Sequence, residues 1–398
     1  MKEDRNRVYI RTFGCQMNVR DSEVIAGILM QVGFELVGSE DEADVVVFNT
    51  CAVREHAEEK VWSEIGRVCK ARRNKERAAR GLAGNARELR KGVPGPIGRK
   101  PVIGLVGCMG RNYGAGAFER SPFVDFVAGP QDISKIPEIL KRIFHSRPSA
   151  LYGKGEDEAN LFERKIWEID GDVRPEQIYH SGFRSGKTQA YIVISEGCSN
   201  HCSYCIVPYV RGPLRHRRRE DILREVRDAV SRGLSEIFLL GQNVNSYAWN
   251  GAVPEDEVTP AVLLKKISDQ DSGHRFSNLV NSLTAPDRYP LTGKQEPVNF
   301  AGLLEMVASV HPELRVRYST SHPKDLSDDV LEVMAGHNNI CRHIHLPVQS
   351  GSSSVLKRMN RKYTREWYLG RVAAINRILP GCTLSTDIIA GFCGETEE

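Results

Sequence analysis

The stretch YIVISEGCSNHCSYC, residues 191–205, carries three cysteines in a C-x3-C-x2-C spacing: Cys198, Cys202 and Cys205. An iron–sulfur cube takes four ligands, so three thiolates from one short loop leave one iron open to a small molecule. A structural zinc site needs a fourth Cys or His nearby, and His201 lies between two of the cysteines, where it is poorly placed to complete the same tetrahedron. We therefore expect an open iron–sulfur site. A zinc knuckle, a simple electron-transfer cluster and unrelated buried thiols are the alternatives.

The residues around this loop alternate between strand and helix patterns. The expected strands are 191–195, 236–240, 315–320, 343–348 and 384–390, and the expected helices are 220–231, 300–310, 328–335 and 365–378. Strand followed by helix, repeated in this way, predicts a partial (β/α) barrel. The polar residues fall after the strands, where the active sites of such barrels form.

The first part of the chain follows the same alternation. Strands are expected at 8–12, 45–48, 102–106 and 123–128, and helices at 21–32, 55–69 and 134–144, the first with Asp21 or Ser22 as its cap. This pattern predicts an open parallel α/β sheet.

Three further cysteines follow the strands of this predicted sheet: Cys15, Cys51 and Cys108. Loops at the carboxyl ends of parallel strands gather at one edge, so three thiols distant in sequence are expected to meet there. They predict a second three-cysteine cluster with one iron unfilled. Any one of them alone would more often be a small buried hydrophobe. Four cysteines lack this placement and are expected to be structural: Cys69, Cys341, Cys382 and Cys393.

The chain of 398 residues is long enough for more than one domain. We expect an N-terminal α/β domain at 1–145, a linker at 146–187 and a partial barrel at 188–398, with a polar insertion at about 249–297. The sequence has no apolar run long enough for a membrane helix and no secretory signal pattern, which predicts a cytoplasmic protein without a membrane partner. In the cytosol, cysteines serve as metal ligands or buried thiols more often than as disulfides.

The net charge is only +4, but basic residues are clustered. Residues 70–100 contain eleven Lys or Arg against two Glu. We call the loop that contains Cys198, Cys202 and Cys205 the cluster loop. A second basic run follows it directly: Arg211, Arg215, Arg217, Arg218 and Arg219. Such clusters can neutralise phosphates. A solvated or disordered insertion is the alternative for 70–100.

With both cysteine sets placed, the chain resembles the radical S-adenosylmethionine (SAM) methylthiotransferases, most closely the tRNA 2-methylthio-N6-dimethylallyladenosine synthases. The matching stretches are TFGCQMN, FNTCAVRE, GLVGCM, SEGCSNHCSYCIVPYVRG, LLGQNVNSY, RYSTSHP, HLPVQSGS, MNRKYTREWY and STDIIAGF. The resemblance implies two [4Fe-4S] clusters. Cys198, Cys202 and Cys205 would hold the SAM-cleaving cluster, and Cys15, Cys51 and Cys108 an auxiliary cluster.

The resemblance also implies a reaction that uses two SAM molecules per turnover. One SAM methylates a sulfur at the auxiliary cluster, and a second gives a radical that removes hydrogen from C2 of adenine. The implied substrate is isopentenylated adenosine 37 in the anticodon loop of tRNA. A reductant such as flavodoxin or ferredoxin would supply the electron, and the sulfur donor is unknown.

Residues at the strand ends are candidates for lining the SAM pocket, or else turn and capping residues: Gln242, Asn243, Ser319, Ser321, His322, Gln349, Ser350 and Asp387. Arg211 and Arg217 match the family's basic motif and are expected to contact cofactor or tRNA, unless they only brace the fold. Apart from the clusters, no catalytic residue is expected.

The chain departs from the family pattern in places. Leu214 and His216 stand where Glu and Ser are usual, and Cys393 where many relatives carry Pro. The sequence stops at Glu398, so we expect the rest of the barrel and the C-terminal TRAM β-domain to be absent. The alternatives are a methylthiotransferase for threonylcarbamoyladenosine in tRNA or for a ribosomal-protein aspartate, and a non-catalytic iron–sulfur RNA-binding or redox-sensing protein.

Overall fold

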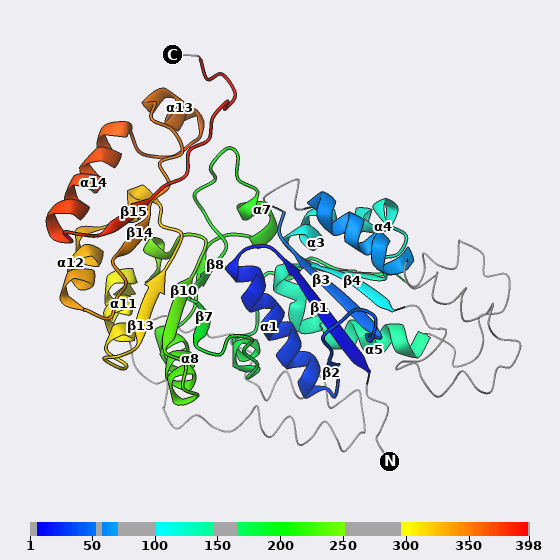
Figure 1. Ribbon diagram of the computed structural model, residues 1–398. Helices are drawn as coiled ribbons and strands as arrows, with labels where there is room; N and C mark the ends of the chain where they lie inside the picture. Colours follow the sequence, from blue (N-terminus) through cyan, green and yellow to red (C-terminus); the bar gives the residue numbers. More distant parts are fainter. Residues whose placement is uncertain (1–5, 53–57, 71–100, 147–164, 251–295, 397–398) are drawn as a thin grey trace, which may run out of the picture.

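The computed structural model describes residues 6–52, 58–70, 101–146, 165–250 and 296–396 (Figure 1). The basic segment 71–100 and most of the expected polar insertion lie outside these residues. No helix within the described ranges is both long and apolar enough to cross a bilayer.

The first part of the chain builds a six-stranded parallel sheet in the order β2-β1-β3-β4-β5-β6. Its strands are β1 (Arg7–Phe13), β2 (Glu35–Leu36), β3 (Val45–Thr50), β4 (Val102–Gly107), β5 (Phe126–Ala128) and β6 (Ile166–Glu168). Every residue of β3 and β4 is buried. This is the composition of central strands covered on both faces, and it explains their unbroken apolar runs.

Helices cover both faces of this sheet. On one face, α1 (Gln16–Gln31) and α5 (Ile136–Ser146) pack their apolar residues against Val8, Val45 and Val106. On the other face, the helix 58–70 and α4 (Gly116–Arg120) close over Val46 and Leu105. The predicted open parallel α/β domain is therefore confirmed.

Helix α1 begins five residues earlier than the sequence pattern predicted. Cys15 occupies its N-cap position, so Asp21 and Ser22 lie inside the helix. The capping expectation was wrong because Asp21 is fully buried and ion-paired with Arg174 and Arg211 at 2.7 and 3.0 Å. An aspartate ordinarily favours a helix cap, but the ion pairs with these distant arginines hold Asp21 inside the helix.

The range expected to be a linker contributes structure to the first sheet. Strand β6 pairs in parallel with β5, and the 3-10 helix η3 (Glu176–His180) places Tyr179 in the same core. Residues 166–180 of the expected linker therefore belong to the N-terminal α/β domain.

The second part of the chain forms a partial barrel. Strands β7 (Gln189–Val193), β10 (Glu236–Leu240) and β13 (Arg315–Tyr318) are parallel neighbours, and β14 (His343–His345) pairs in parallel with β15 (Thr383–Ser385). Val316 of β13 forms a parallel bridge with Ile340, three residues before β14 begins. Helices α8 (Arg219–Ser231), α11 (Phe300–Ala308), α12 (Asp328–Gly336) and α14 (Arg365–Ile378) follow the strands. The expected barrel order is confirmed.

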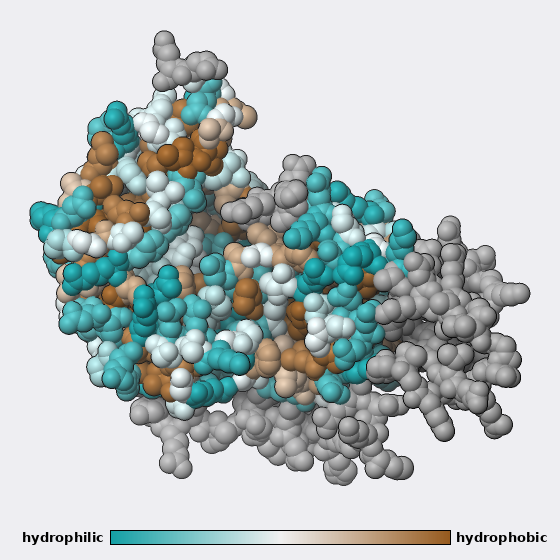
Figure 2. Space-filling model, in the orientation of Figure 1, coloured by the Kyte–Doolittle hydropathy of each residue, from teal (hydrophilic) through white to brown (hydrophobic). Residues whose placement is uncertain are grey.

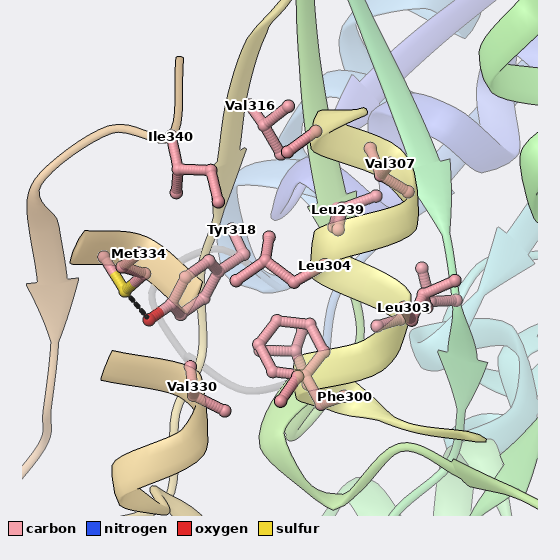
Figure 3. Close-up of a cluster of buried hydrophobic side chains, with 14 of the residues drawn as sticks. Leu239, Phe300, Leu303, Leu304, Val307, Val316, Tyr318, Val330, Met334 and Ile340 are labelled. Atoms are coloured by element: carbon pink, nitrogen blue, oxygen red, sulfur yellow. Dashed lines mark hydrogen bonds between the residues drawn. The ribbon is translucent and has the colours of Figure 1, made fainter. Parts of the chain in front are cut away.

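The barrel core lies between these strands and helices. Figure 3 shows Leu303, Leu304 and Val307 of α11 packed beside Val316 and Tyr318 of β13. The Tyr318 hydroxyl donates to Met334 Sδ at 3.0 Å, which satisfies the one polar atom of that buried ring.

Short elements complete the barrel. Strands β8 (Ser195–Glu196) and β9 (Arg215–His216) form an antiparallel pair around the cluster loop, and α7 (Val207–Arg211) lies between them. Strands β11 (Ala248–Trp249) and β12 (Val298–Asn299) pair at the two ends of the expected insertion. The 3-10 helices are η2 (Pro130–Lys135), η4 (Val244–Ser246) and η5 (Pro323–Asp325), and the remaining helices are α3 (Cys108–Tyr113) and α13 (Ser353–Arg358).

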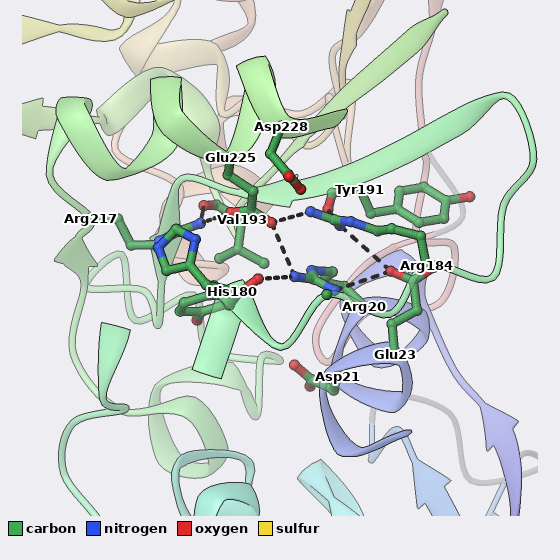
Figure 4. Close-up of polar contacts among 12 residues, drawn as sticks. Arg20, Asp21, Glu23, His180, Arg184, Tyr191, Val193, Arg217, Glu225 and Asp228 are labelled. Atoms are coloured by element: carbon green, nitrogen blue, oxygen red, sulfur yellow. Dashed lines mark hydrogen bonds and ion pairs between the residues drawn. The ribbon is translucent and has the colours of Figure 1, made fainter. Parts of the chain in front are cut away.

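A buried polar network joins the two domains (Figure 4). Glu225 of α8 accepts hydrogen bonds from Arg20 of α1 at 3.1 Å, from Arg217 at 2.7 Å and from Arg184. Arg184 also lies 3.6 Å from Glu23. Since these side chains are nearly inaccessible to solvent, α1 is fixed against the barrel by charge as well as by packing.

The exposed surface is mostly polar, with large apolar side chains exposed singly across it. Hydrophobic residues are most visible over the C-terminal elements α13 and α14 (Figure 2), where Trp367 and Leu369 are about half exposed.

Candidate metal centres

The cysteines of the first domain are brought together by the register of three neighbouring strands. Phe13 of β1 pairs with Thr50 of β3, and Thr50 pairs with Gly107 of β4. Cys51 and Cys108 are the next residues after Thr50 and Gly107, and Cys15 comes two after Phe13. Because neighbouring strands lie about 5 Å apart, these thiols are gathered at one edge of the sheet.

Two asparagines brace this edge. Asn18 donates to Asn49 Oδ1 at 3.1 Å and to the Thr50 carbonyl at 3.2 Å, and its own Oδ1 accepts from the Cys15 thiol at 3.4 Å. Asn49 returns a bond to the Asn18 carbonyl at 2.8 Å. We did not predict a role for either residue. The sequence signal that could have revealed Asn49 is a polar residue at the end of the buried apolar run of β3.

The environment of Cys15 favours a thiolate. A hydrogen bond with Cys51, opposed by burial, and the charge of Arg211 lower the pKa of the Cys15 thiol to about 5. Cys15 also occupies the N-cap position of the 16-residue helix α1, whose amino end attracts negative charge. Burial raises the pKa of Cys108, and the neighbouring charges of Asp21 and Cys15 add to that rise, although the Arg211 charge opposes it.

The other three cysteines lie in the loop between β8 and α7. The Cys198 amide donates to the Gly212 carbonyl at 3.1 Å, and the Cys205 amide to the Cys202 carbonyl at 2.9 Å. His201 has a φ of 48°, a left-handed conformation unusual for a non-glycine residue. Burial raises the pKa values of Cys198 and Cys205.

The segment 359–363, which follows α13, contacts this loop. Arg361 donates from Nη1 to Cys202 Sγ at 3.4 Å and from Nη2 to the Pro347 carbonyl at 3.1 Å. Asn360 donates to the His201 carbonyl at 2.8 Å, and the Ser203 amide donates to the Met359 carbonyl at 3.1 Å. The sequence offered MNRKY as a motif without a role, and the structure places it on the cluster loop.

A single bound metal ion needs its ligand atoms close together. Tetrahedral zinc with bonds of about 2.3 Å would hold its sulfurs about 3.8 Å apart. Within the described residues, the one group of three ligating side chains whose atoms all lie within 4.8 Å is Glu176, His180 and Asp221. Both carboxylates of that group are already paired with arginines. In the part of the chain that the structure describes, neither cysteine set forms a group this compact.

The expected pocket residues lie at the carboxyl ends of the barrel strands. Asn243 follows β10 and receives the His322 amide at 3.2 Å, while its own amide donates to Asp325 at 2.6 Å. This pairing gives Asn243 a bracing role between strand ends. Ser319 contacts Thr320, Gln349 exchanges backbone bonds with Asp387 and Ile389, and Ser350 accepts from the Ser352 amide. Gln242 is half-buried beside Asn243, and Asp387 lies 3.4 Å from His345.

Several buried polar atoms at these strand ends have no hydrogen-bond partner among the described residues. They are Ser195 Oγ, both amide atoms of Asn245, Ser321 Oγ and His322 Nε2. Burial, followed by the charges of Arg361 and Lys324, lowers the pKa of His322 to about 3, so the ring is neutral. A buried polar atom without a hydrogen-bond partner lowers the stability of the fold. Several such atoms at one edge of the barrel therefore fit a site where a polar ligand supplies the missing hydrogen bonds. Ser195 was missed because it is the last residue of the expected strand 191–195, and Asn245 because it lies five residues beyond the end of β10.

The two expected arginines have different surroundings. Arg217 donates to Glu176, Glu225 and the Val193 carbonyl, and it stacks on Tyr179. Since its guanidinium is occupied by protein groups, Arg217 fits the bracing alternative. Arg211 instead contacts Cys108 Sγ from Nε at 3.2 Å.

The remaining cysteines are separate from both sets. Cys69 and Cys382 pack at the edges of hydrophobic cores, Cys341 accepts from Arg315 at 2.9 Å, and Cys393 is exposed.

Two family models match the chain. Residues 7–129 match the model described as "Uncharacterized protein family UPF0004", and residues 192–398 match "Radical SAM superfamily".

Curated relatives match along the whole chain. It is 39% identical over 396 residues to the tRNA-2-methylthio-N(6)-dimethylallyladenosine synthase of Bacteroides fragilis, with 100% of this chain and 69% of that protein covered. The protein of the same name from Carboxydothermus hydrogenoformans is 39% identical over 392 residues, covering 98% of this chain and 70% of its own length.

A solved structure has a similar fold. The apo form of the cobalamin-dependent S-adenosylmethionine radical enzyme OxsB matches with a TM-score of 0.52 and 11% identity, covering 97% of this chain and 49% of that one. At this identity the likeness concerns the fold alone.

Proposed function

The chain belongs to the radical SAM methylthiotransferases, and we propose that it transfers a methylthio group to C2 of N6-isopentenyladenosine at position 37 of tRNA. It is an enzyme that uses [4Fe-4S] clusters and SAM and acts on tRNA. The observation that carries the proposal is the pair of cysteine sets, each at the carboxyl ends of parallel strands and joined to the other through the short helix α7.

Each cysteine set would hold one cluster and leave one iron for an exogenous ligand. Cys15, Cys51 and Cys108 fit the auxiliary cluster, and Cys198, Cys202 and Cys205 the SAM-cleaving one. When bound, these groups supply the radical chemistry that C2 of adenine needs, because that carbon carries no acidic proton. The protein contributes positioning and exclusion of water.

The partnerless polar atoms at the barrel strand ends would receive the SAM molecule. Asn245, Ser321 and His322 offer donors and acceptors that nothing else in the described chain uses. Gln242, Ser319, Gln349, Ser350 and Asp387 lie on the same rim and are proposed as further lining residues.

The tRNA base would enter between the two cysteine sets. Tyr209 is 75% exposed on α7, the helix that lies between the cluster loop and the first domain (Figure 1). A base splayed from a single-stranded loop stacks readily on an exposed aromatic ring. The electron would come from a small protein such as flavodoxin or ferredoxin.

Two cysteine variants test the division of labour. Cys202→Ala should form no 5'-deoxyadenosine, because the SAM-cleaving cluster loses a ligand. Cys51→Ala should still form 5'-deoxyadenosine from SAM and dithionite, yet give no methylthiolated nucleoside. Both products are measured by mass spectrometry after reaction with isopentenylated tRNA, with Cys393→Ser as the matched control that should retain both.

Several results would overturn this assignment. Deoxyadenosine formation by Cys202→Ala, or its loss in Cys51→Ala, would mean that the sets do not divide the chemistry. Product only on threonylcarbamoyladenosine tRNA or a ribosomal-protein aspartate would identify another branch of the family. No SAM cleavage by the unmodified protein would favour a non-catalytic iron–sulfur protein.

A further inference from the structure

Arg211 reaches from the barrel into the cysteine site of the first domain. It is the last residue of α7, six positions after Cys205, and only 2% of it is exposed. Its Nε donates to Cys108 Sγ at 3.2 Å. A side chain fixed by the loop of one cysteine set therefore contacts a thiol of the other.

The rest of Arg211 is held in place by first-domain residues. Its Nη2 donates to Asp21 Oδ2 at 3.0 Å, and its own carbonyl accepts from Gln131 Nε2 at 2.8 Å. Asp21 is held in turn by Arg174 at 2.7 Å. The guanidinium thus has one orientation, with Nε aimed at the sulfur.

A buried cation that donates to a cluster ligand has a defined electronic effect. The reduction potential of an iron–sulfur cluster depends on hydrogen bonds to its sulfurs and on nearby charge. Reduction adds negative charge, so a donor at Cys108 Sγ stabilises the reduced form more than the oxidised form and raises the potential. Asp21 also neutralises the arginine, which leaves the directional Nε bond as the main influence.

We propose that Arg211 is a positioning residue for the auxiliary cluster. Its bond to Cys108 raises the reduction potential of that cluster and fixes the position of the cluster relative to the loop of Cys198, Cys202 and Cys205. This inference rests on the proposed function, since it requires that Cys15, Cys51 and Cys108 hold a cluster. Arg361 provides a natural comparison, because it contacts Cys202 of the other set at 3.4 Å and is also buried, with 5% of it exposed.

The test uses the 398-residue chain with Cys198, Cys202 and Cys205 replaced by alanine, so that one cluster remains. Its reduction potential is measured by an electrochemical titration followed by electron paramagnetic resonance, with Arg211→Lys or Arg361→Lys added. Lysine keeps the charge but loses the planar Nε donor. We expect a more negative potential in Arg211→Lys and an unchanged one in Arg361→Lys.

A second measurement needs no substitution of Arg211. In the same three-alanine protein labelled with nitrogen-15 arginine, the reduced cluster should show a magnetic coupling to a guanidinium nitrogen. This coupling tests the contact between Arg211 and the cluster even if the Arg211→Lys variant binds no iron.

The outcomes separate the two claims. If the three-alanine protein binds no cluster, the cysteine assignment in the proposed function is wrong. If it binds one whose potential does not change in Arg211→Lys, or which shows no nitrogen-15 coupling, the cluster assignment stands and the role of Arg211 is wrong.

Discussion

Glu225 is the residue on which the polar interface between the two domains converges. Three arginines, Arg20, Arg184 and Arg217, donate to its carboxylate, which is 2% exposed. A buried pair is weak evidence for stability, but removing one partner leaves uncompensated charge.

Glu225→Ala should therefore lower the free energy of unfolding by about 3–5 kcal/mol. The measurement is chemical denaturation of the unmodified protein and the variant. Asp228→Ala, which removes an exposed carboxylate of α8 paired with Arg232 at the end of that helix, should change the free energy of unfolding by less than about 0.5 kcal/mol. Equal effects of the two substitutions would contradict the structural account of the interface.

The same residue predicts a pH dependence. Burial opposes its ionisation, but the charges of Arg217, Arg20 and Arg184 outweigh burial and hold the pKa of Glu225 at about 2. Because the folded-state pKa lies below the unfolded one, its stabilisation is present above about pH 4.5 and is lost as the pH falls toward 2. The loss should amount to about 3 kcal/mol. Acid unfolding of Glu225→Gln should lack this component, and an identical acid profile would refute it.

At the level of elements, the turn between β4 and α3 sets the position of Cys108. Gly107 has a φ of 88°, which side chains rarely adopt, and a Cβ there would lie 2.5 Å from Asn49 Oδ1 and 2.7 Å from the Thr50 carbonyl. Only glycine suits both the angle and the close approach.

Gly107→Ala should therefore displace Cys108 and reduce the iron bound by the first domain. We expect a destabilisation of about 1–3 kcal/mol and a loss of auxiliary-cluster absorbance. Gly116→Ala is the matched control, because nothing lies within 4 Å of its Cβ position and its φ is ordinary. Full cluster loading in Gly107→Ala would show that this turn does not position the thiol.

Most elements were predictable because their signals are local. The apolar run 45–48 became β3, and the five strands expected after residue 190 became β7, β10, β13, β14 and β15. The start of α1 was not predictable, because an aspartate such as Asp21 usually indicates a helix cap. Only the structure shows that Asp21 is paired with Arg174 and Arg211 instead. Strand β6 was missed because its three residues lie in a mostly polar stretch with no apolar run beside them.

At the level of the whole molecule, the arrangement of the cysteine sets could be predicted and their supports could not. Strand order and parallel register suffice to gather Cys15, Cys51 and Cys108, because strand ends align. The contacts of Arg361 with Cys202 and of Arg211 with Cys108 join residues more than a hundred positions apart. No local pattern encodes such a pairing. The resemblance to the methylthiotransferases is confirmed by relatives 39% identical along the chain.

The most direct measurement is the iron and sulfide content of anaerobically reconstituted protein, read together with its Mössbauer spectrum. The account predicts about eight irons per chain as two [4Fe-4S] clusters. Cys202→Ala and Cys51→Ala should each retain about half of that iron. Bound zinc, or a single cluster in the unmodified chain, would contradict it.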